Sequence, residues 1–320
     1  MPLVSVIMPA YNAAAYIQDA LWSALGQTFR DLEVVVVDDG SHDGTIAIVR
    51  DLAAGDSRVR LIEQHNGGVA TARNAALRVA RGEFLALLDS DDVWAPTFLE
   101  AQLQVFRDAK VDIVTGNAFE IDGPRDGHPS RPYPDPRPDP VLATILADTE
   151  AIFIMSVFRR EVIERIGLFD ESMRSNEDYD FWLRAAAAGA TFTRNAQPLG
   201  AYRRRRDSLS ASEVRMLSGI LTVYRKLRPS ILDRPSELAL LDRQIDRFET
   251  ELLRAEARAA IEMGDRRAAA ARLAELRQRR PSVSLAAAEL LARWAPGLLP
   301  KLYRLRRARR VRQHASGAVA

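Results

Sequence analysis

Cysteine is absent from all 320 residues of the sequence. Disulfide bonds, thiolate nucleophiles and zinc–thiolate sites are therefore excluded, and nothing indicates an oxidising compartment. Histidine is scarce as well, with four residues and no pair at the helical spacing of a metal site. A bound metal would have to be held mainly by carboxylates, which favours a hard ion such as Mg²⁺ or Mn²⁺.

Long apolar runs are also missing, since no stretch approaches the ~20 uncharged apolar residues of a membrane-spanning helix. The chain starts with a β-rich run, MPLVSVIMPAYN, in place of the basic start and apolar segment of a secretory signal. With 47% hydrophobic and 28% charged residues, the composition is that of a globular protein. We therefore expect a cytoplasmic protein with one large domain and a smaller one.

Charge is distributed unevenly, although the net charge is only +2. From Arg293 to the end there are eight Lys or Arg residues and no Asp or Glu, so the rest of the chain is acidic overall. Residues 290–312 mix leucine and aromatic residues with these cations, which suits an anionic membrane surface and a lipid-linked acceptor. A peripheral location on the inner face of the plasma membrane is the resulting hypothesis, with a solvated tail as the alternative. No base-stacking pattern supports a nucleic-acid partner.

Strand and helix patterns alternate through the first ninety residues. Apolar, β-branched runs at residues 4–8, 33–37, 59–62 and 84–88 alternate with helical patterns at residues 13–25, 45–52 and 70–80. This order predicts an open, mostly parallel α/β sheet flanked by helices. Beyond it we expect a strand at residues 112–116, helices at 158–166 and 178–188, and a proline-rich binding loop at 122–140.

Composition shifts to alanine, leucine, arginine and glutamate at helical spacing after Ser212. We therefore place a catalytic domain at residues 1–212 and a helical C-terminal region with a basic amphipathic tail at residues 213–320. Residues 257–281 have the pattern of one helix–turn–helix unit, and a single copy does not establish a repeat array.

Two acidic clusters follow apolar strands, at the sheet edge where open α/β folds bind ligands. Asp38 and Asp39 are adjacent, so that one of them faces the edge; the alternative is a turn capping the next helix. Asp89 and Asp91 can point to one side and converge on a hard cation that also binds a diphosphate. The alternative for this second cluster is a solvated acidic loop.

Two further motifs lie at predicted helix starts. Glu177 and Asp178 would meet the positive end of a helix, so a purely structural role stands beside that of a general base acting on an acceptor hydroxyl. Gly67 and Gly68 would let the backbone approach a phosphate at the next helix, unless they only form a turn. Arg73 in that helix can hydrogen-bond to an anion or a base edge.

Taken in order, these motifs resemble those of family-2 glycosyltransferases with the GT-A fold, over about residues 3–210. The matching segments are Pro9-Ala10-Tyr11-Asn12, Val37-Asp38-Asp39-Gly40-Ser41, Gly67-Gly68-Val69-Ala70, Ala72-Arg73-Asn74, Leu88-Asp89-Ser90-Asp91-Asp92 and Asn176-Glu177-Asp178. The resemblance implies inverting transfer of a sugar from a nucleoside-diphosphate sugar, with UDP as the expected leaving group. The acceptor would belong to bacterial polysaccharide, cell-envelope glycan or glycolipid synthesis.

The resemblance also implies roles for individual residues. Asp178, with Glu177 beside it, would be the catalytic base, Asp91 the main metal ligand, and Asp89 a second ligand near the ribose. The implied donor-binding residues are Pro9, Ala10, Tyr11, Asn12, Asp39, Gly68, Arg73, Asp89 and Ser90, with Asp39 and Arg73 on the base.

One segment departs from the family pattern Tyr-Arg-x-His-x-x-Ser-x-Ser. Here Arg205 stands where the histidine that assists at the metal would be, and Ser208 follows. Because arginine stays protonated, it is not a metal ligand. We expect Arg205 to pair with the diphosphate and Ser208 to contact the donor. Weaker metal binding and a solvated basic loop are the alternatives for this segment.

Competing functions remain to be weighed against sugar transfer. The Gln-x-x-Arg-Trp signature of processive synthases is not in its expected place, which favours a single transfer. A dehydrogenase would need a G-x-G-x-x-G motif after the first strand, and a nucleotidyltransferase would need a glycine-rich phosphate loop there. The sequence has Pro9-Ala10-Tyr11-Asn12 at that place, which argues against both classes. The main alternative is a catalytically inactive nucleotide-sugar-binding scaffold, against which the presence of Asp91 and Asp178 argues.

Overall fold

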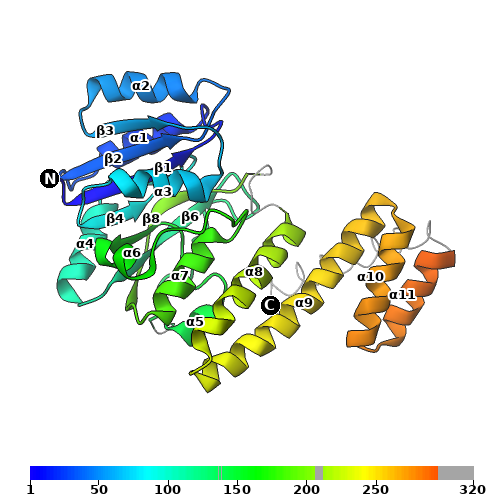
Figure 1. Ribbon diagram of the computed structural model, residues 1–320. Helices are drawn as coiled ribbons and strands as arrows, with labels where there is room; N and C mark the ends of the chain where they lie inside the picture. The colour runs from blue at the N-terminus through cyan, green and yellow to red at the C-terminus, as the bar shows by residue number, and fades with distance from the viewer. Residues whose placement is uncertain (136, 138, 206–211, 295–320) are drawn as a thin grey trace, which may run out of the picture. The chain divides into compact units, whose positions relative to one another are not determined.

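The computed structural model describes residues 1–135, 137, 139–205 and 212–294 (Figure 1). The chain divides into two compact units. One comprises Met1–Ala211 with Thr222–Leu241, and the other Ser212–Leu221 with Asp242–Ala320.

Within its described residues, the first unit is built on one eight-stranded sheet of order β3-β2-β1-β4-β7-β6-β8-β5. Its strands are β1 Val4–Ala10, β2 Leu32–Asp38, β3 Val59–Glu63, β4 Phe84–Leu87, β5 Val93–Trp94, β6 Ile113–Ile121, β7 Ser156–Arg159 and β8 Phe192–Arg203. The pairs β3–β2, β2–β1 and β1–β4 are parallel, and so is the pair β6–β8. The short strand β7 is antiparallel to both β4 and β6, and the short strand β5 is antiparallel to β8. The predicted α/β sheet is confirmed, with a mixed second half.

Helices cover both faces of this sheet. They are α1 Ile17–Leu25, α2 Thr45–Gly55, α3 Val69–Val79, α4 Phe98–Asp108, α5 Leu142–Ala147, α6 Arg160–Ile166 and α7 Glu177–Ala187. On one face, alternate side chains of β1 and β2 such as Met8 and Val36 pack with Leu21 of α1 and Val49 of α2. The intervening side chains point to the other face, and α3 packs against β1 and β2. Burial on both faces explains why these strands are continuous apolar runs.

The prediction of a helix over residues 158–166 is wrong at its start. Residues 156–159 form β7, which pairs with both β4 and β6, and the helix begins at Arg160. Phe158 is fully buried in the centre of the sheet. Short apolar runs carry no periodicity that separates a central strand from a buried helix, so only the pairing of distant strands decides this segment.

The second unit is helical. The helices α8 Glu213–Leu227 and α9 Pro235–Met263 contribute residues to both units, and α10 Arg266–Arg279 and α11 Val283–Trp294 belong to the second. The predicted helix–turn–helix is confirmed: Gly264 takes the left-handed φ of 75° between α9 and α10, and Asp265 caps α10 by accepting a hydrogen bond from the Ala268 amide. Within the part of the chain that the structure describes, no helix has the length and apolar character needed to cross a bilayer.

Candidate active site

The loops after β1 and β2 are joined at the carboxyl edge of the sheet. Asn12, whose φ of 47° is left-handed, donates its amide to Ser41 Oγ and accepts from the His42 amide, both at 2.9 Å. Ala10 is buried at the end of β1, and its carbonyl accepts from the Asp39 amide at 2.8 Å. Tyr11 is 48% exposed. These contacts fix an edge from which Tyr11 projects toward solvent.

Asp39 is buried and holds the glycine loop that precedes α3. Its carboxylate accepts hydrogen bonds from Gln64 Nε2 at 2.7 Å and from the amides of Gly67 and Gly68, both at 2.8 Å. Gly68 has a φ of 93°, a conformation that only glycine adopts without strain. Its neighbour Asp38 accepts from the Ser41 amide at 2.9 Å, the turn contact expected for this pair. The first acidic cluster thus shapes the edge loops.

Arg73 on α3 connects two motifs that lie far apart in the sequence. Its side chain is 3% exposed, and its Nη1 donates to Glu177 Oε1 at 2.6 Å while Nη2 donates to Asp89 Oδ1 at 2.7 Å. Burial lowers the pKa of Arg73, and the charges of Asp89 and Glu177 outweigh that effect and raise it. Its Nε has no hydrogen-bond partner among the described residues. Arg73 is therefore a permanent buried cation between the aspartate loop and α7.

Carboxylates crowd the loop after β4. Burial raises the pKa of Asp91, and the charge of Asp89 raises it further. Asp92 is 1% exposed, and its pKa is well above the ordinary value because of burial and the charges of Asp89 and Asp91. One Asp92 oxygen accepts from the Arg203 amide at 2.9 Å, and the other has no partner within the described residues. Ser90 is buried between the two proposed ligands. Burial and mutual repulsion therefore disfavour the charged forms of Asp91 and Asp92.

These residues fit a divalent cation. The side chains of Asp89 and Asp91 are 28% and 25% exposed, so both remain open to a ligand. No cluster of three or more His, Asp or Glu ligands occurs in the described residues. Mg²⁺ is commonly held by one or two carboxylates together with substrate phosphates, and a pair of crowded carboxylates meets that requirement.

Two arginines from the end of β8 reach the same loop. Arg205 Nη1 lies 3.4 Å from Asp91 Oδ2, and its guanidinium is 4.9 Å from the centre of the Tyr16 ring. Arg203 stacks on that ring at 4.8 Å and donates Nε to the Asp91 carbonyl at 3.0 Å. Ser208 lies outside the described residues. The structure thus brings Arg205 to the proposed metal ligand.

Sequence reasoning missed Arg203 and Tyr16. Besides the Asp91 loop, Arg203 contacts Asp122 at the start of the proline-rich loop. A signal for Arg203 was present, because residues 203 and 205 in an extended segment point to the same side. Tyr16 carried no such signal, since its position depends on how α1 packs.

Asp178 lies in the first turn of α7. Burial raises the pKa of its carboxyl to about 6, the Glu177 charge adds to this, and Arg73 opposes it. A carboxyl with this pKa is largely ionised at neutral pH and still basic enough to accept a proton. The side chain therefore has the acid–base properties of a general base.

A polar clamp in the first unit holds α7 in place. Tyr179 donates its hydroxyl to the Ile145 carbonyl at 2.9 Å, and Tyr224 on α8 donates to the Leu146 carbonyl at 2.9 Å. Lys226, also on α8, binds the buried Asp180 at 2.8 Å. These contacts fix the start of α7, and with it Asp178.

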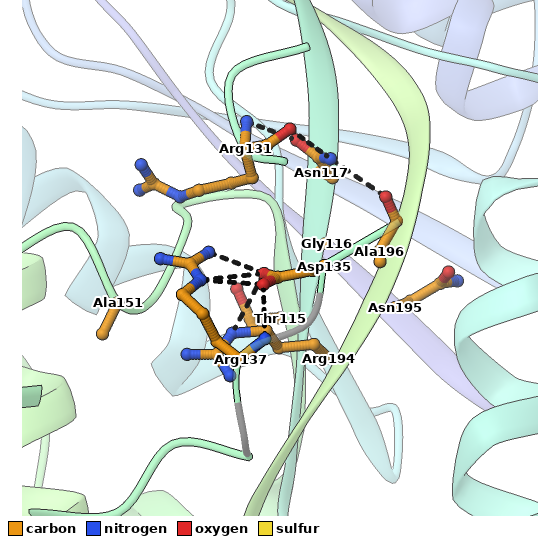
Figure 2. Close-up of a pocket in the computed structure, with 10 residues that line it drawn as sticks. All are labelled: Thr115, Gly116, Asn117, Arg131, Asp135, Arg137, Ala151, Arg194, Asn195 and Ala196. Atoms are coloured by element: carbon orange, nitrogen blue, oxygen red, sulfur yellow. Dashed lines mark hydrogen bonds and ion pairs between the residues drawn. The ribbon is translucent and has the colours of Figure 1, made fainter. Parts of the chain in front are cut away.

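A pocket between β6, β8 and the proline-rich loop lies apart from these residues (Figure 2). Asp135 binds Arg137 at 2.6 Å and Arg194 at 3.6 Å, and its pKa falls to about 2, chiefly through the hydrogen bond from Arg137. The cavity has room for about one water molecule. From Asn195 in this pocket to Arg203, β8 runs roughly 26 Å at about 3.3 Å per residue. The ion pairs of Asp135 anchor the proline-rich loop to β8, and the cavity beside them is too small for a sugar.

Comparison with known proteins adds three findings. Residues 5–167 match the sequence profile of the family Glycosyl transferase family 2. The chain is 32% identical over 223 residues to the uncharacterized glycosyltransferase EpsJ of Bacillus subtilis (strain 168), covering 66% of this chain and 63% of that protein. A glycosyltransferase of Rickettsia prowazekii (strain Madrid E) is 32% identical, and the chain covers 58% of it. The chain therefore spans roughly three fifths of the length of these curated relatives.

Among solved structures, the chain is similar to S. aureus TarS 1-349 in complex with UDP-GlcNAc. The TM-score is 0.66 and the identity 23%, over 92% of this chain and 87% of that one. It is also similar to a mannosyltransferase from Pyrobaculum calidifontis in complex with GDP-Man and Mn²⁺. There the TM-score is 0.58 and the identity 26%, over 95% and 82% of the two chains. The fold is GT-A.

Proposed function

The chain belongs to glycosyl transferase family 2, and from that premise we propose that it transfers a single sugar, with inversion, from a nucleoside-diphosphate sugar to an acceptor hydroxyl. We assign this chemistry to residues 1–212 and propose residues 213–320 as a helical C-terminal region, of which Thr222–Leu241 belong to the first compact unit. One observation supports the proposal most strongly: buried Arg73 joins Asp89 of the aspartate loop to Glu177, the neighbour of Asp178. Arg73 thereby holds the loop that would bind the diphosphate leaving group close to the helix start that carries the proposed base.

Asp178 is the proposed base. Its carboxylate takes the proton of the acceptor hydroxyl while that oxygen forms a bond to the anomeric carbon. The bond from that carbon to the diphosphate oxygen breaks on the opposite side, and the diphosphate leaves with the electron pair. Glu177 and Arg73 set the charge around Asp178, and the clamp on α7 keeps it in place.

The donor would bind along the edge of the sheet. We propose that Pro9, Ala10, Tyr11 and Asn12 line the nucleotide site, with UDP as the expected nucleotide. We propose that Arg73, at this edge, also contacts the base of the nucleotide. The remaining proposed donor contacts are Asp39, Gly68, Asp89, Ser90, Arg205 and Ser208.

Asp91, with Asp89 beside it, would hold Mn²⁺ or Mg²⁺. When bound, such an ion neutralises negative charge on the departing diphosphate. The relative from P. calidifontis was solved with Mn²⁺. Because Arg205 already lies near Asp91, we propose that its guanidinium turns to a diphosphate oxygen when the donor binds.

Replacing Arg205 by alanine is expected to weaken UDP binding roughly tenfold or more, because a charged hydrogen bond contributes about 1.5–3 kcal/mol. Arg205→His is the matched variant: imidazole can bind a metal, so this change should lower the Mn²⁺ concentration needed for binding. Titration calorimetry of UDP at several Mn²⁺ concentrations measures both effects. Unchanged UDP affinity in the alanine variant would exclude a diphosphate contact.

A panel of nucleotide sugars tests the proposed function itself. With Mn²⁺ present, we expect at least one donor to release its nucleoside diphosphate, and UDP with Mn²⁺ to stabilise the protein by about 2.7 kcal/mol at a hundredfold excess over Kd. Asp91→Asn should abolish the Mn²⁺-dependent part of that stabilisation. Neither turnover nor stabilisation with any donor would overturn the proposal, and stabilisation without turnover would indicate the inactive scaffold.

We propose an acceptor from polysaccharide, cell-envelope glycan or glycolipid synthesis, and action on the cytoplasmic side of the membrane. The family of the chain and its similarity to glycosyltransferases support a glycan acceptor.

A further inference from the structure

The last described helix, α11, is apolar on two faces. Its sequence is VSLAAAELLARW, in which only Glu289 and Arg293 carry charge. One face packs into the core of the second unit, where Leu285, Leu291 and Ala292 contact α10 residues such as Leu273. A helix that is apolar all round is normally covered on every side.

The opposite face of α11 is exposed. Val283 is 88% exposed, Leu290 58% and Trp294 83%, and Ala287 is exposed between them. These four residues, here called the α11 stripe, stand at spacings of four, three and four and so lie on one side of the helix. Large apolar side chains gathered on one exposed face indicate a surface that something covers.

The charge that α11 itself presents to solvent has one sign. Glu289, the only acid in α11, is 7% exposed and is bound by Arg277 at 2.9 Å and by Arg293 at 2.7 Å. The accessible surface of the helix therefore offers apolar groups, the hydroxyl of Ser284 and the half-exposed Arg293. Residues 295–320, which directly follow in the sequence, contain seven Lys or Arg and no Asp or Glu.

We propose that the α11 stripe and the basic segment after it dock together on an anionic lipid bilayer. Apolar side chains would enter the interface while the cations meet lipid phosphates, and each cation near such a surface strengthens binding about fivefold. A second copy of the chain fits less well, because it would bring an equal cluster of cations against this one. A nucleic acid could pair with the cations, but it would leave the apolar side chains of Leu290 and Val283 exposed to water. This inference does not rest on sugar transfer.

Vesicle flotation of the full chain tests the proposal. The probes are vesicles of phosphatidylcholine alone and of phosphatidylcholine with phosphatidylglycerol. The test variant is Leu290→Gln with Trp294→Gln, which leaves the net charge unchanged. The control is Met263→Gln, which removes an apolar side chain that is 77% exposed, at the end of α9 and outside the stripe.

We expect the unaltered chain and the Met263→Gln control to float with anionic vesicles and much less with neutral ones. The Leu290→Gln/Trp294→Gln variant should bind anionic vesicles at least tenfold more weakly, since two apolar side chains no longer enter the bilayer. Arg306→Gln with Arg307→Gln should weaken binding roughly fivefold per cation. Since all of these positions are exposed or outside the described fold, circular dichroism melting should match that of the unaltered chain.

Two results would overturn the proposal. One is equal flotation of the stripe variant and the Met263→Gln control. The other is a chain that ignores vesicles and instead forms dimers in sedimentation that the stripe variant loses, which would assign the stripe to a second copy.

Discussion

Asp178→Asn is expected to lower kcat roughly 10²–10⁴-fold with little change in donor affinity, because the amide cannot accept the acceptor's proton. The wild-type rate should rise with pH through about 6, the pKa of Asp178, and fall about tenfold per pH unit below it. The variant should lose this dependence. Steady-state kinetics between pH 5 and 8, with the donor identified from the panel, measure both effects.

The free energy of unfolding of Asp178→Asn distinguishes a general base from an acid that only caps the helix. The folded-state pKa of Asp178 lies above its ordinary value of 3.8, so its contribution to stability is complete below pH 3.8 and is lost as pH rises through about 6. Asparagine does not ionise, and Asp178→Asn should therefore stabilise the fold by about 3 kcal/mol at pH 7.5. An inactive variant would then be the more stable one.

The control is Glu161→Gln, which removes an exposed acid from the first turn of α6. There the helix dipole favours the charge, so the change should cost about 0.3–1 kcal/mol and leave activity intact. If Asp178→Asn lost stability in the same way and kept its rate, Asp178 would be a capping residue and the assignment of the base would be wrong.

Arg73→Met is expected to lower the free energy of unfolding by about 3–5 kcal/mol, since it leaves Glu177 and Asp89 without their buried cation. For a domain of 150–250 residues this corresponds to a fall in Tm of roughly 6–20 °C. Any residual activity should need a higher pH, because Arg73 holds the pKa of Asp178 down. Thermal melts and the pH–rate profile test the two parts.

Arg78→Met is the matched control on the same helix. Arg78 also pairs with a glutamate, Glu171 at 2.9 Å, but the two side chains are 55% and 41% exposed. Such surface pairs contribute about 0–1 kcal/mol, so this variant should melt close to the wild type. Equal losses in both variants would show that Arg73 contributes no more than a surface arginine.

Local pattern was enough to predict the parallel half of the sheet. Four apolar strands separated by helical periods leave few alternatives, because each run can be buried only between covering helices. The same reasoning placed Asp39 and Asp89 at one sheet edge, and both lie there. It failed at residues 156–159, where strand and helix patterns look alike and only pairing with β4 and β6 decides.

The aspartate motifs themselves needed no structure to be found, since their spacing in the sequence carries the family resemblance. The contacts between these motifs, in contrast, could be found only from the tertiary structure. Arg73 and Glu177 are 104 residues apart, and no pattern in the chain indicates their ion pair. The contacts of Arg203 with the Asp91 loop and Asp122 likewise span 112 and 81 residues.

Sequence alone thus determined the fold class, the family resemblance and which carboxylates to consider, because periodicity and motif spacing are local properties of the chain. Tertiary structure alone decided which charges share a buried environment. Burial and neighbouring charge set the pKa of Asp178 near 6, and both depend on segments that meet only when the sheet is assembled. The same holds for α11, where packing against α10 determines which of its two apolar faces stays exposed.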